Sequence, residues 1–192
     1  EPSLLPPAPE ETEALPKSPA QDTPDPLSLT APFTMDDTTL FARSGGTITG
    51  FSSAFLKEVS DNASEIIYVD LLIPAEINGT PITTIGSRAF LSSQKNLPDN
   101  LRIRTLDLSQ ASALTQIDDY AFYNTSGPLY DEFASTQLVL PDRLQTIGSN
   151  AFNGLKTFRG DLLLPDSITA IGSSGFQNCG FDGRLTLPSN EG

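Results

Sequence analysis

Histidine, the side chain that most often serves as a general base or a transition-metal ligand, is absent from the 192 residues. Its absence excludes a Ser-His-Asp triad, a Cys-His pair and a His-based zinc site. The single cysteine, Cys179, has no partner for an internal disulfide. Carboxylates remain as candidate chemistry, because Asp and Glu together number 24.

Paired carboxylates hydrolyse glycosidic bonds in many enzymes, and regularly spaced ones bind calcium. The adjacent pairs Asp36-Asp37 and Asp118-Asp119 lack the D-x-[DN]-x-[DN]-G spacing of a calcium loop, and no constellation indicates catalysis. We therefore expect no catalytic residue, no metal and no cofactor. A carboxylate-based hydrolase is the least favoured function.

The net charge narrows the range of partners. The formal charge is −13, whereas nucleic acid binding depends on Lys and Arg that neutralise phosphates. We therefore expect no nucleic acid partner. No apolar stretch approaches the roughly 20 residues that a membrane-spanning helix needs.

One ten-residue sequence motif, here called a phrase, occurs four times along the chain. A repeated motif requires a repeated structural element that holds each copy. "TTIGSRAFLS" at 83–92 returns as "TQIDDYAFYN" at 115–124, "QTIGSNAFNG" at 145–154 and "TAIGSSGFQN" at 169–178. A phrase repeated at a fixed order along the chain is typical of a solenoid rather than of a single active site.

A second phrase, L-x-L followed by Pro or Ser, alternates with the first. Its first leucines are Leu71, Leu106, Leu138, Leu162 and Leu185, which are 35, 32, 24 and 23 residues apart. The shorter spacings fall within the 20 to 29 residues of a leucine-rich repeat, and the longer ones indicate inserted loops.

Each repeat is expected to form a strand, a turn and a short helical turn. The outer leucines of L-x-L point into the core and the central residue points outward, because side chains alternate along a strand. In the phrase at 145–154, Gly148 would allow a sharp turn, and Ser149 occupies the position of a helix N-cap before the inward-facing Ala151 and Phe152. Asp118 replaces this glycine in one copy, so that turn is expected to differ locally.

Two different segments precede the repeats. Residues 1–32 hold nine of the sixteen prolines and six acids against Lys17, which predicts an extended or disordered Pro-rich acidic tether. The alternative is a tail without a tethering role. Residues 33–70 are predicted to form an N-terminal cap with a β-hairpin around Ser44-Gly45-Gly46, and 71–192 a solenoid of about four to five repeats.

The repeats resemble the BspA-type leucine-rich repeats of bacterial surface proteins, written L-x-L-P-x-x-[LI]-x-x-I-G-x-x-A-F-x-x-C. "LLLPDSITAIGSSGFQNC" at 162–179 departs at Gly175 alone, and "LVLPDRLQTIGSNAFNGL" at 138–155 has Leu155 in place of Cys. The resemblance implies a mainly β, right-handed α/β-type solenoid with a parallel sheet and short helical or 3-10 turns. It also implies export to the cell surface or medium, with a lipid anchor upstream as one possibility.

The resemblance implies a non-catalytic binding or adhesion module for an extracellular protein or glycan. A structural spacer or assembly domain of a larger envelope protein is the alternative. The predicted partner-binding positions are the outward residues of the strands on the concave face: Asp70, Leu72, Thr105, Asp107, Gln137, Val139, Asp161, Leu163, Arg184 and Thr186. Five strands at about 4.8 Å spacing would make this surface roughly 20 Å wide. Its apolar members would either bind a partner or be covered by another element, such as the leader.

Two further places are candidates for contact with a partner. Tyr123, Tyr130 and Phe133 lie in the inserted loop at 123–136, where their rings would either anchor a partner or pack onto the solenoid. The last strand phrase, at 185–188, is not followed by its own return phrase. Either the array is incomplete at the C-terminus, or another chain closes this edge in an oligomer.

Overall fold

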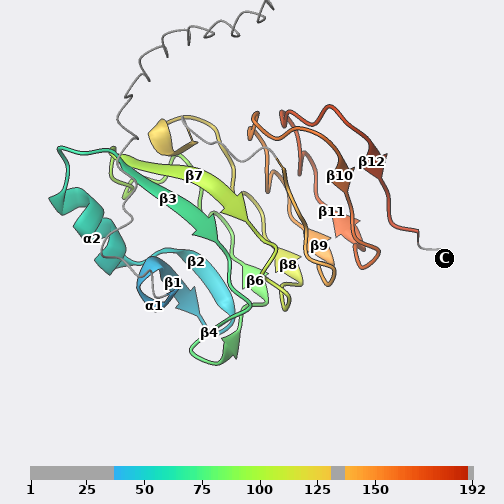
Figure 1. Cartoon of the computed structure of the whole chain (residues 1–192), viewed down its shortest axis with the longest axis horizontal. Helices are drawn as coiled ribbons and strands as arrows, with labels where there is room; N and C mark the ends of the chain where they lie inside the picture. Colours follow the sequence, from blue (N-terminus) through green and yellow to red (C-terminus); the bar gives the residue numbers. More distant parts are fainter. Residues whose placement is uncertain (1–36, 131–136, 190–192) are drawn as a thin grey trace, which may run out of the picture.

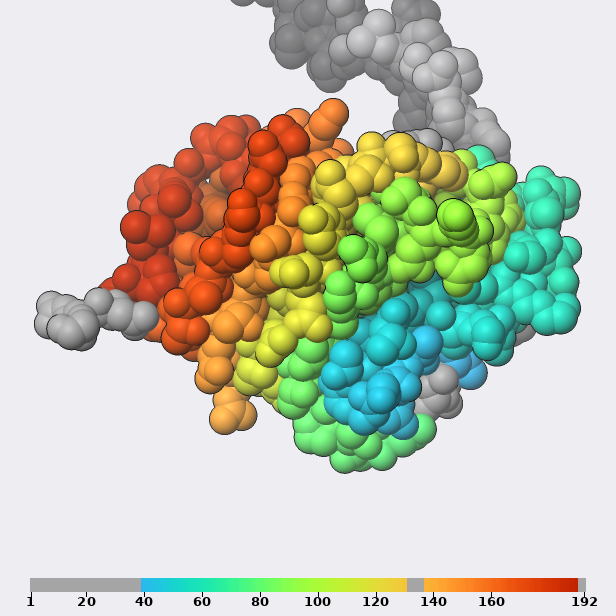
Figure 2. Space-filling view, turned by 180° about the vertical axis from the view of Figure 1, so that it is seen from behind, coloured from blue at the N-terminus to red at the C-terminus, as the bar shows by residue number. Residues whose placement is uncertain are grey.

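The repeated phrase forms the longest sheet of the protein. The computed structural model describes residues 37–130 and 137–189. Six strands pair in the order β1-β2-β6-β8-β9-β11, and the pairings from β2 onward are parallel. The strands of this sheet are β1 (Phe41–Ser44), β2 (Thr47–Phe51), β6 (Thr84–Ile85), β8 (Gln116–Ile117), β9 (Thr146–Ile147) and β11 (Ala170–Ile171). Successive repeats lie side by side, so the sequence colours follow one another as bands in Figures 1 and 2.

The L-x-L segments form short sheets of their own. β3 (Ile67–Leu72) pairs in parallel with β7 (Leu101–Asp107), and β10 (Leu162–Leu163) with β12 (Leu185–Thr186). Residues 137–140 between them are not part of a strand. The prediction of one sheet with five L-x-L strands is therefore wrong, and the continuous ladder belongs to the other side of each repeat. The L-x-L segments are followed by proline in four of five cases, and proline has no N–H for a ladder.

The turn after each two-residue strand is not helical, which corrects the expected helical turn. Arg88, Tyr120, Asn150 and Ser174, one in each repeat, have φ between 56° and 60°. A residue in the left-handed region directly after the expected N-cap ends any helical run before it begins. Ala151 and Phe152 nevertheless point into the core as predicted, each 0% exposed.

The turn is held by backbone bonds to the next repeat. Tyr120 N–H donates to Ser149 O at 2.9 Å, and Phe122 N–H donates to Ala151 O at 2.8 Å. The expected capping residues bond across the same interface: Ser87 Oγ donates to Asp119 O, and Asp119 Oδ1 accepts from Ser149 N–H at 2.6 Å. Asp118 leaves the turn unchanged, because Tyr120 keeps the same positive φ as its counterparts.

Gly148 is required by the approach of the neighbouring repeat, not by a positive φ. A Cβ at this position would lie 2.5 Å from the carbonyl carbon of Asp118 and closer still to the amide nitrogen of Asp119. A Cβ at Gly172 would likewise lie too close to the backbone of Gly148 and Ser149 in the preceding repeat. The expectation that this glycine serves a sharp turn is therefore corrected.

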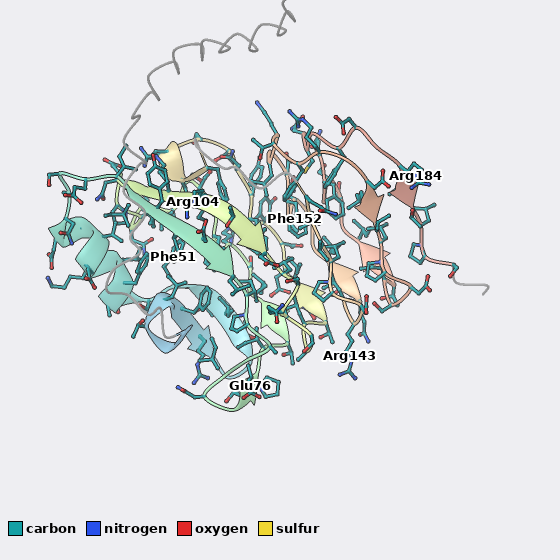
Figure 3. The ribbon with its side chains drawn as sticks, in the orientation of Figure 1. Phe51, Glu76, Arg104, Arg143, Phe152 and Arg184 are labelled. Carbon is teal, nitrogen blue, oxygen red and sulfur yellow. The ribbon has the colours of Figure 1, made fainter. Side chains whose placement is uncertain are left out.

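A column of phenylalanine rings runs through the core. Phe90, Phe122, Phe152 and Phe176 stack in succession with centroids 5.2 to 5.5 Å apart and ring planes within 12° of parallel. Figure 3 labels Phe152 near the middle of this column. Cys179 packs against the same core, and its Sγ donates to Phe152 O at 3.1 Å.

The N-terminal elements close the first repeat. α1 (Asp37–Leu40) leads into the predicted hairpin of β1 and β2, and α2 (Ser53–Asp61) follows, with Ser52 Oγ accepting from Phe55 N–H at 3.1 Å. Asn100 ties the end of α2 to the repeats, since its Nδ2 donates to three carbonyls, those of Val59, Asn62 and Glu65. β3 spans residue 70, where the boundary between cap and solenoid was predicted, and continues into the first repeat. That boundary remains a prediction.

The sequence analysis missed a small hairpin. β4 (Glu76–Ile77) and β5 (Thr80–Pro81) pair antiparallel around Asn78-Gly79, both at positive φ. An Asn-Gly pair between β-prone residues is the signal that would have found it. The 3-10 helix η1 (Pro128–Tyr130) lies in the inserted loop and packs against β7.

Candidate functional site

The outward residues of the L-x-L segments form one exposed surface, which we call the LxL face. Its members are the ten predicted strand positions, from Asp70 to Thr186. Leu72, Val139 and Leu163 are 44%, 50% and 55% exposed. Their neighbours on either side, such as Leu162 and Leu164, are at most 8% exposed. The predicted alternation is therefore confirmed in these three repeats, where aliphatic side chains occupy the solvent side. It is wrong for the last strand, because Leu185 and Leu187, expected to point into the core, are 60% and 63% exposed.

A charged cluster lies on the LxL face where β3 pairs with β7. Arg104 donates from Nε to Asp70 Oδ1 at 2.9 Å and from its terminal nitrogen to Oδ2 at 2.5 Å, and Thr105 Oγ1 donates to Asp70 Oδ1 at 2.8 Å. Arg104 is labelled in Figure 3. The hydrogen bonds from Arg104 outweigh partial burial and lower the pKa of Asp70 from its ordinary value of 3.8.

Arg104 was missing from the predicted set because β7 contains an irregularity. The register shifts between Val69 and Asp70, so that Val69 pairs with Ile103 and Asp70 pairs with Thr105. Arg104 is the additional residue of this bulge, which turns its side chain toward Asp70. The sequence carries the signal: in "LRIRTLDL" the alternation of apolar and polar residues changes phase at Arg104 and Thr105.

A second charged pair lies at the other end of the LxL face. Asp161 accepts from Arg184 N–H at 2.8 Å and from its guanidinium at 3.3 Å. The backbone N–H of Arg184 contributes most to lowering the pKa of Asp161. Asp107, between the two ends, is fixed by Ser109 N–H at 2.7 Å. The face thus has charged pairs at both ends and Val139 and Leu163 between them.

The three aromatic residues predicted in the inserted loop have different positions. Tyr130 is 6% exposed, and its hydroxyl donates to Phe90 O at 2.7 Å, so it is a core residue and not a binding anchor. Burial raises the pKa of Tyr130 well above its ordinary value. Tyr123 is half-buried and packs on Tyr120 with ring centroids 5.4 Å apart. Phe133 lies outside the described residues.

The described residues offer little chemistry beyond recognition. In residues 37–130 and 137–189, no three His, Cys, Asp or Glu side chains are grouped so that they could hold a metal ion. Burial raises the pKa of Cys179 to about 11, so the thiol is protonated at neutral pH and is a poor nucleophile. Within the same described ranges, no helix has the length and apolar character needed to cross a membrane.

The family assignment follows from the repeats themselves. A sequence model of the BspA type leucine rich repeat region matches residues 128–191. Residues 128–191 carry BspA-type leucine-rich repeats. The match covers the closely spaced repeats, whereas the earlier copies have longer insertions and departures such as Asp118 and Ser109. The parallel sheet with few helices is the leucine-rich-repeat fold.

Two solved structures of leucine-rich repeat proteins align with part of the chain. A leucine-rich repeat protein from Bacteroides ovatus aligns at 20% identity over 77% of this chain and 39% of its own, with a TM-score of 0.42. The T. pallidum leucine rich repeat protein TpLRR aligns at 20% identity over 74% of this chain and 63% of its own, with a TM-score of 0.36. The chain thus spans less than two thirds of either protein. No curated protein matches the sequence.

Proposed function

We propose that the chain is a non-catalytic binding module that works outside the cytoplasm and presents the LxL face to a protein partner. The observation that carries the proposal is the exposure of Leu72, Val139 and Leu163, each 44% to 55%, at positions outside the buried core. A row of partly exposed aliphatic side chains on one face favours a role in contact with another molecule.

The arrangement of the LxL face suits a protein partner. Val139 and Leu163 come from successive repeats and supply an apolar centre, while Asp70 with Arg104 and Asp161 with Arg184 supply a polar rim. Protein interfaces combine such a centre with rim charges that set orientation and association rate. The charged pairs already satisfy each other, so a partner meets a face whose charges are fixed in place.

The proposed location rests on the type of repeat. BspA-type repeats are typical of surface-associated proteins, and the acidic, Pro-rich residues 1–32 would act as a tether of roughly 90 to 100 Å if fully extended. A lipid anchor upstream is part of the same proposal. The alternative function, a spacer or assembly domain of an envelope protein, would use the fold without a specific partner on the LxL face.

Leu163→Asp tests the proposal. The side chain is 55% exposed, so the variant should fold with a free energy of unfolding within about 0.5 kcal/mol of the wild type. Binding to a panel of immobilised extracellular matrix proteins, measured by surface plasmon resonance, should weaken by about tenfold or more. Circular dichroism melting measures the folding of both proteins.

Two matched variants make the result specific. Gln145→Asp adds the same charge to an exposed residue just before β9, away from the LxL face, and should keep full binding. Leu162→Asp places the charge at the neighbouring core position, 8% exposed, and should unfold the protein. If the Leu163→Asp variant unfolds, the Leu163 side chain is covered in the folded protein and is not part of a binding surface. Saturable binding that Leu163→Asp leaves unchanged, or no binding by the wild type, would favour the spacer function.

A further inference from the structure

The repeats present a second surface, on the side of the turns. The parallel backbone bonds align residues that occupy the same place in successive repeats, because Arg88 N–H donates to Asp119 O and Asn150 N–H to Ser173 O. One column contains Arg88, Tyr120, Asn150 and Ser174, and the next contains Leu91, Tyr123, Asn153 and Gln177. We call these two columns the turn face.

Tyr120 is an unfavourable residue for its backbone conformation. All four members of the first column have φ between 56° and 60°, a region that Asn tolerates better than most residues other than Gly. The next repeat has Asn150 at this position, so the fold does not require an aromatic ring there. Residues that break a local rule without a structural need are often found at functional sites.

The Tyr120 ring is held in place and remains accessible. The Arg88 guanidinium lies 5.3 Å from the centroid of the ring, and the ring of Tyr123 packs at 5.4 Å with a tilt of 55°. Both tyrosines are only half-buried, and Arg88 is exposed. The cation and the second ring therefore fix a small aromatic platform at the surface.

An ordered group of amides adjoins the platform. Asn153 is 5% exposed, and its Nδ2 donates to Asn150 Oδ1 at 2.8 Å and to Gln177 Oε1 at 3.3 Å. Asn178 Nδ2 donates to Asn153 Oδ1 at 3.2 Å. The oxygens of Asn150 and Gln177 are thus occupied, and their NH₂ groups have no partner among the described residues. The hydrogen bonds therefore fix the direction of two amide donors, that of Asn150 in the repeat after Tyr120 and that of Gln177 two repeats after Tyr123.

We propose that the turn face binds a carbohydrate. A ring face attracts the C–H groups on one side of a sugar ring, and the side-chain NH₂ groups of Asn150 and Gln177 donate to its hydroxyl oxygens. The platform, Asn150 and Gln177 belong to three successive repeats, so an oligosaccharide lying across these repeats would contact all of them. A protein partner fits less well, because this face lacks the row of exposed aliphatic side chains found on the LxL face.

The test is a glycan array of neutral and sialylated oligosaccharides probed with the wild type and with Tyr120→Asn. This variant introduces the residue that the next repeat carries at the same φ, so it should fold with an unchanged or higher melting temperature. The array signal should fall to background, and calorimetric titration with the best free oligosaccharide should show an affinity about tenfold or more lower. Since the chain has no Trp and four Tyr, sugar binding should also change the tyrosine fluorescence of the wild type.

Two further variants keep the result decisive. Arg88→Ala removes the contact with Tyr120 and should weaken sugar binding severalfold, which supports the site even where Tyr120→Asn is poorly folded. Leu163→Asp on the LxL face should bind sugar normally, so failure of either proposal is distinguishable from failure of the other. A wild type that binds no glycan, or glycan binding that survives both Tyr120→Asn and Arg88→Ala, would overturn the inference. Loss of protein binding alone in Tyr120→Asn would assign the turn face to a protein.

Discussion

Single residues in this protein act mainly across the boundary between repeats. Asp119, at a position expected to cap a helix, accepts a hydrogen bond from Ser149 of the following repeat, and Asp70 is bound by Arg104 and Thr105, more than thirty residues away. Tyr130 was predicted as one of the loop anchors and is a core residue whose hydroxyl bonds to Phe90 O. Residue type indicated which side chains could form such hydrogen bonds. The partner of each side chain depends on how the repeats stack on one another.

The Asp70 carboxylate should make stability depend on pH. Its lowered pKa means that the folded state binds this proton less readily than the unfolded state, so stability rises with pH. The contribution is complete above the ordinary value of 3.8 and is lost as the pH falls through the lowered value. Because the Asp70 side chain is 47% exposed, we expect Asp70→Asn to cost about 0.5 to 1 kcal/mol at pH 7.

Urea unfolding at pH 7 and at an acidic pH below 3.8 measures this effect. The difference between the wild type and Asp70→Asn should shrink at the acidic pH, because the wild-type carboxylate is then increasingly protonated. Asp142→Asn, at an exposed position, is the control and should show a small difference at both values. A gap between wild type and Asp70→Asn that is equally large at both values would contradict the role of this ion pair.

The secondary structure elements show where local patterns were sufficient and where they were not. The hairpin of β1 and β2 and the strand β3 follow their sequence signals. The six-stranded sheet was not predicted, since its members from β6 onward (β6, β8, β9 and β11) are two residues long and carry no recognisable period. These strands form because the stacking of the repeats aligns the copies of the phrase, so that the backbones of successive copies form hydrogen bonds.

Gly148→Ala tests whether the approach of the backbones determines this sheet. The added Cβ would lie 2.5 Å from the Asp118 carbonyl carbon, so the repeats must move apart. We expect a loss of about 1 to 3 kcal/mol in the free energy of unfolding, the usual cost of overpacking. Urea unfolding followed by circular dichroism measures it.

Gly45→Ala provides the contrast for Gly148→Ala. Gly45 has φ of 57° but no atom within 4 Å of an added Cβ, so only backbone strain opposes the change. Its cost should be about 1 kcal/mol. If Gly148→Ala were the milder of the two, close approach would not be what this position requires.

At the scale of the whole molecule, each repeat supplies the partner that the previous one needs. The phenylalanine column passes through four repeats, and Ile85, Ile117 and Ile147 are each buried by the repeat that follows. Among the described residues, the apolar side chains of the last strands are more exposed: Ile171 is 40% exposed, and Leu185 and Leu187 are 60% and 63% exposed. These exposed side chains lie on β11, on β12 and just after it. The expectation that another chain covers this edge in an oligomer stays a prediction.

Hydrogen exchange should reveal a gradient of stability toward this edge. Gly148 N–H donates to Ile117 O and Gly172 N–H donates to Ile147 O, both at 2.7 Å, so the two amides differ mainly in what lies outside them. Because Ile171, next to Gly172, is 40% exposed and Ile147, next to Gly148, is 2% exposed, we expect the Gly172 amide to exchange at least about tenfold faster by NMR. Equal rates for the two amides would indicate that the described repeats open only as one unit.

The sequence by itself determined the class of fold, the type of repeat and which strand residues face the solvent, because apolar alternation and phrase spacing are local properties of the chain. Only the tertiary structure decided that the longest ladder runs through the Thr-Ile segments, that Arg104 joins Asp70 through a bulge, and that Tyr130 is buried. These outcomes depend on contacts between residues some thirty positions apart, whose alignment is set by how the repeats stack. No periodicity within one repeat contains that information.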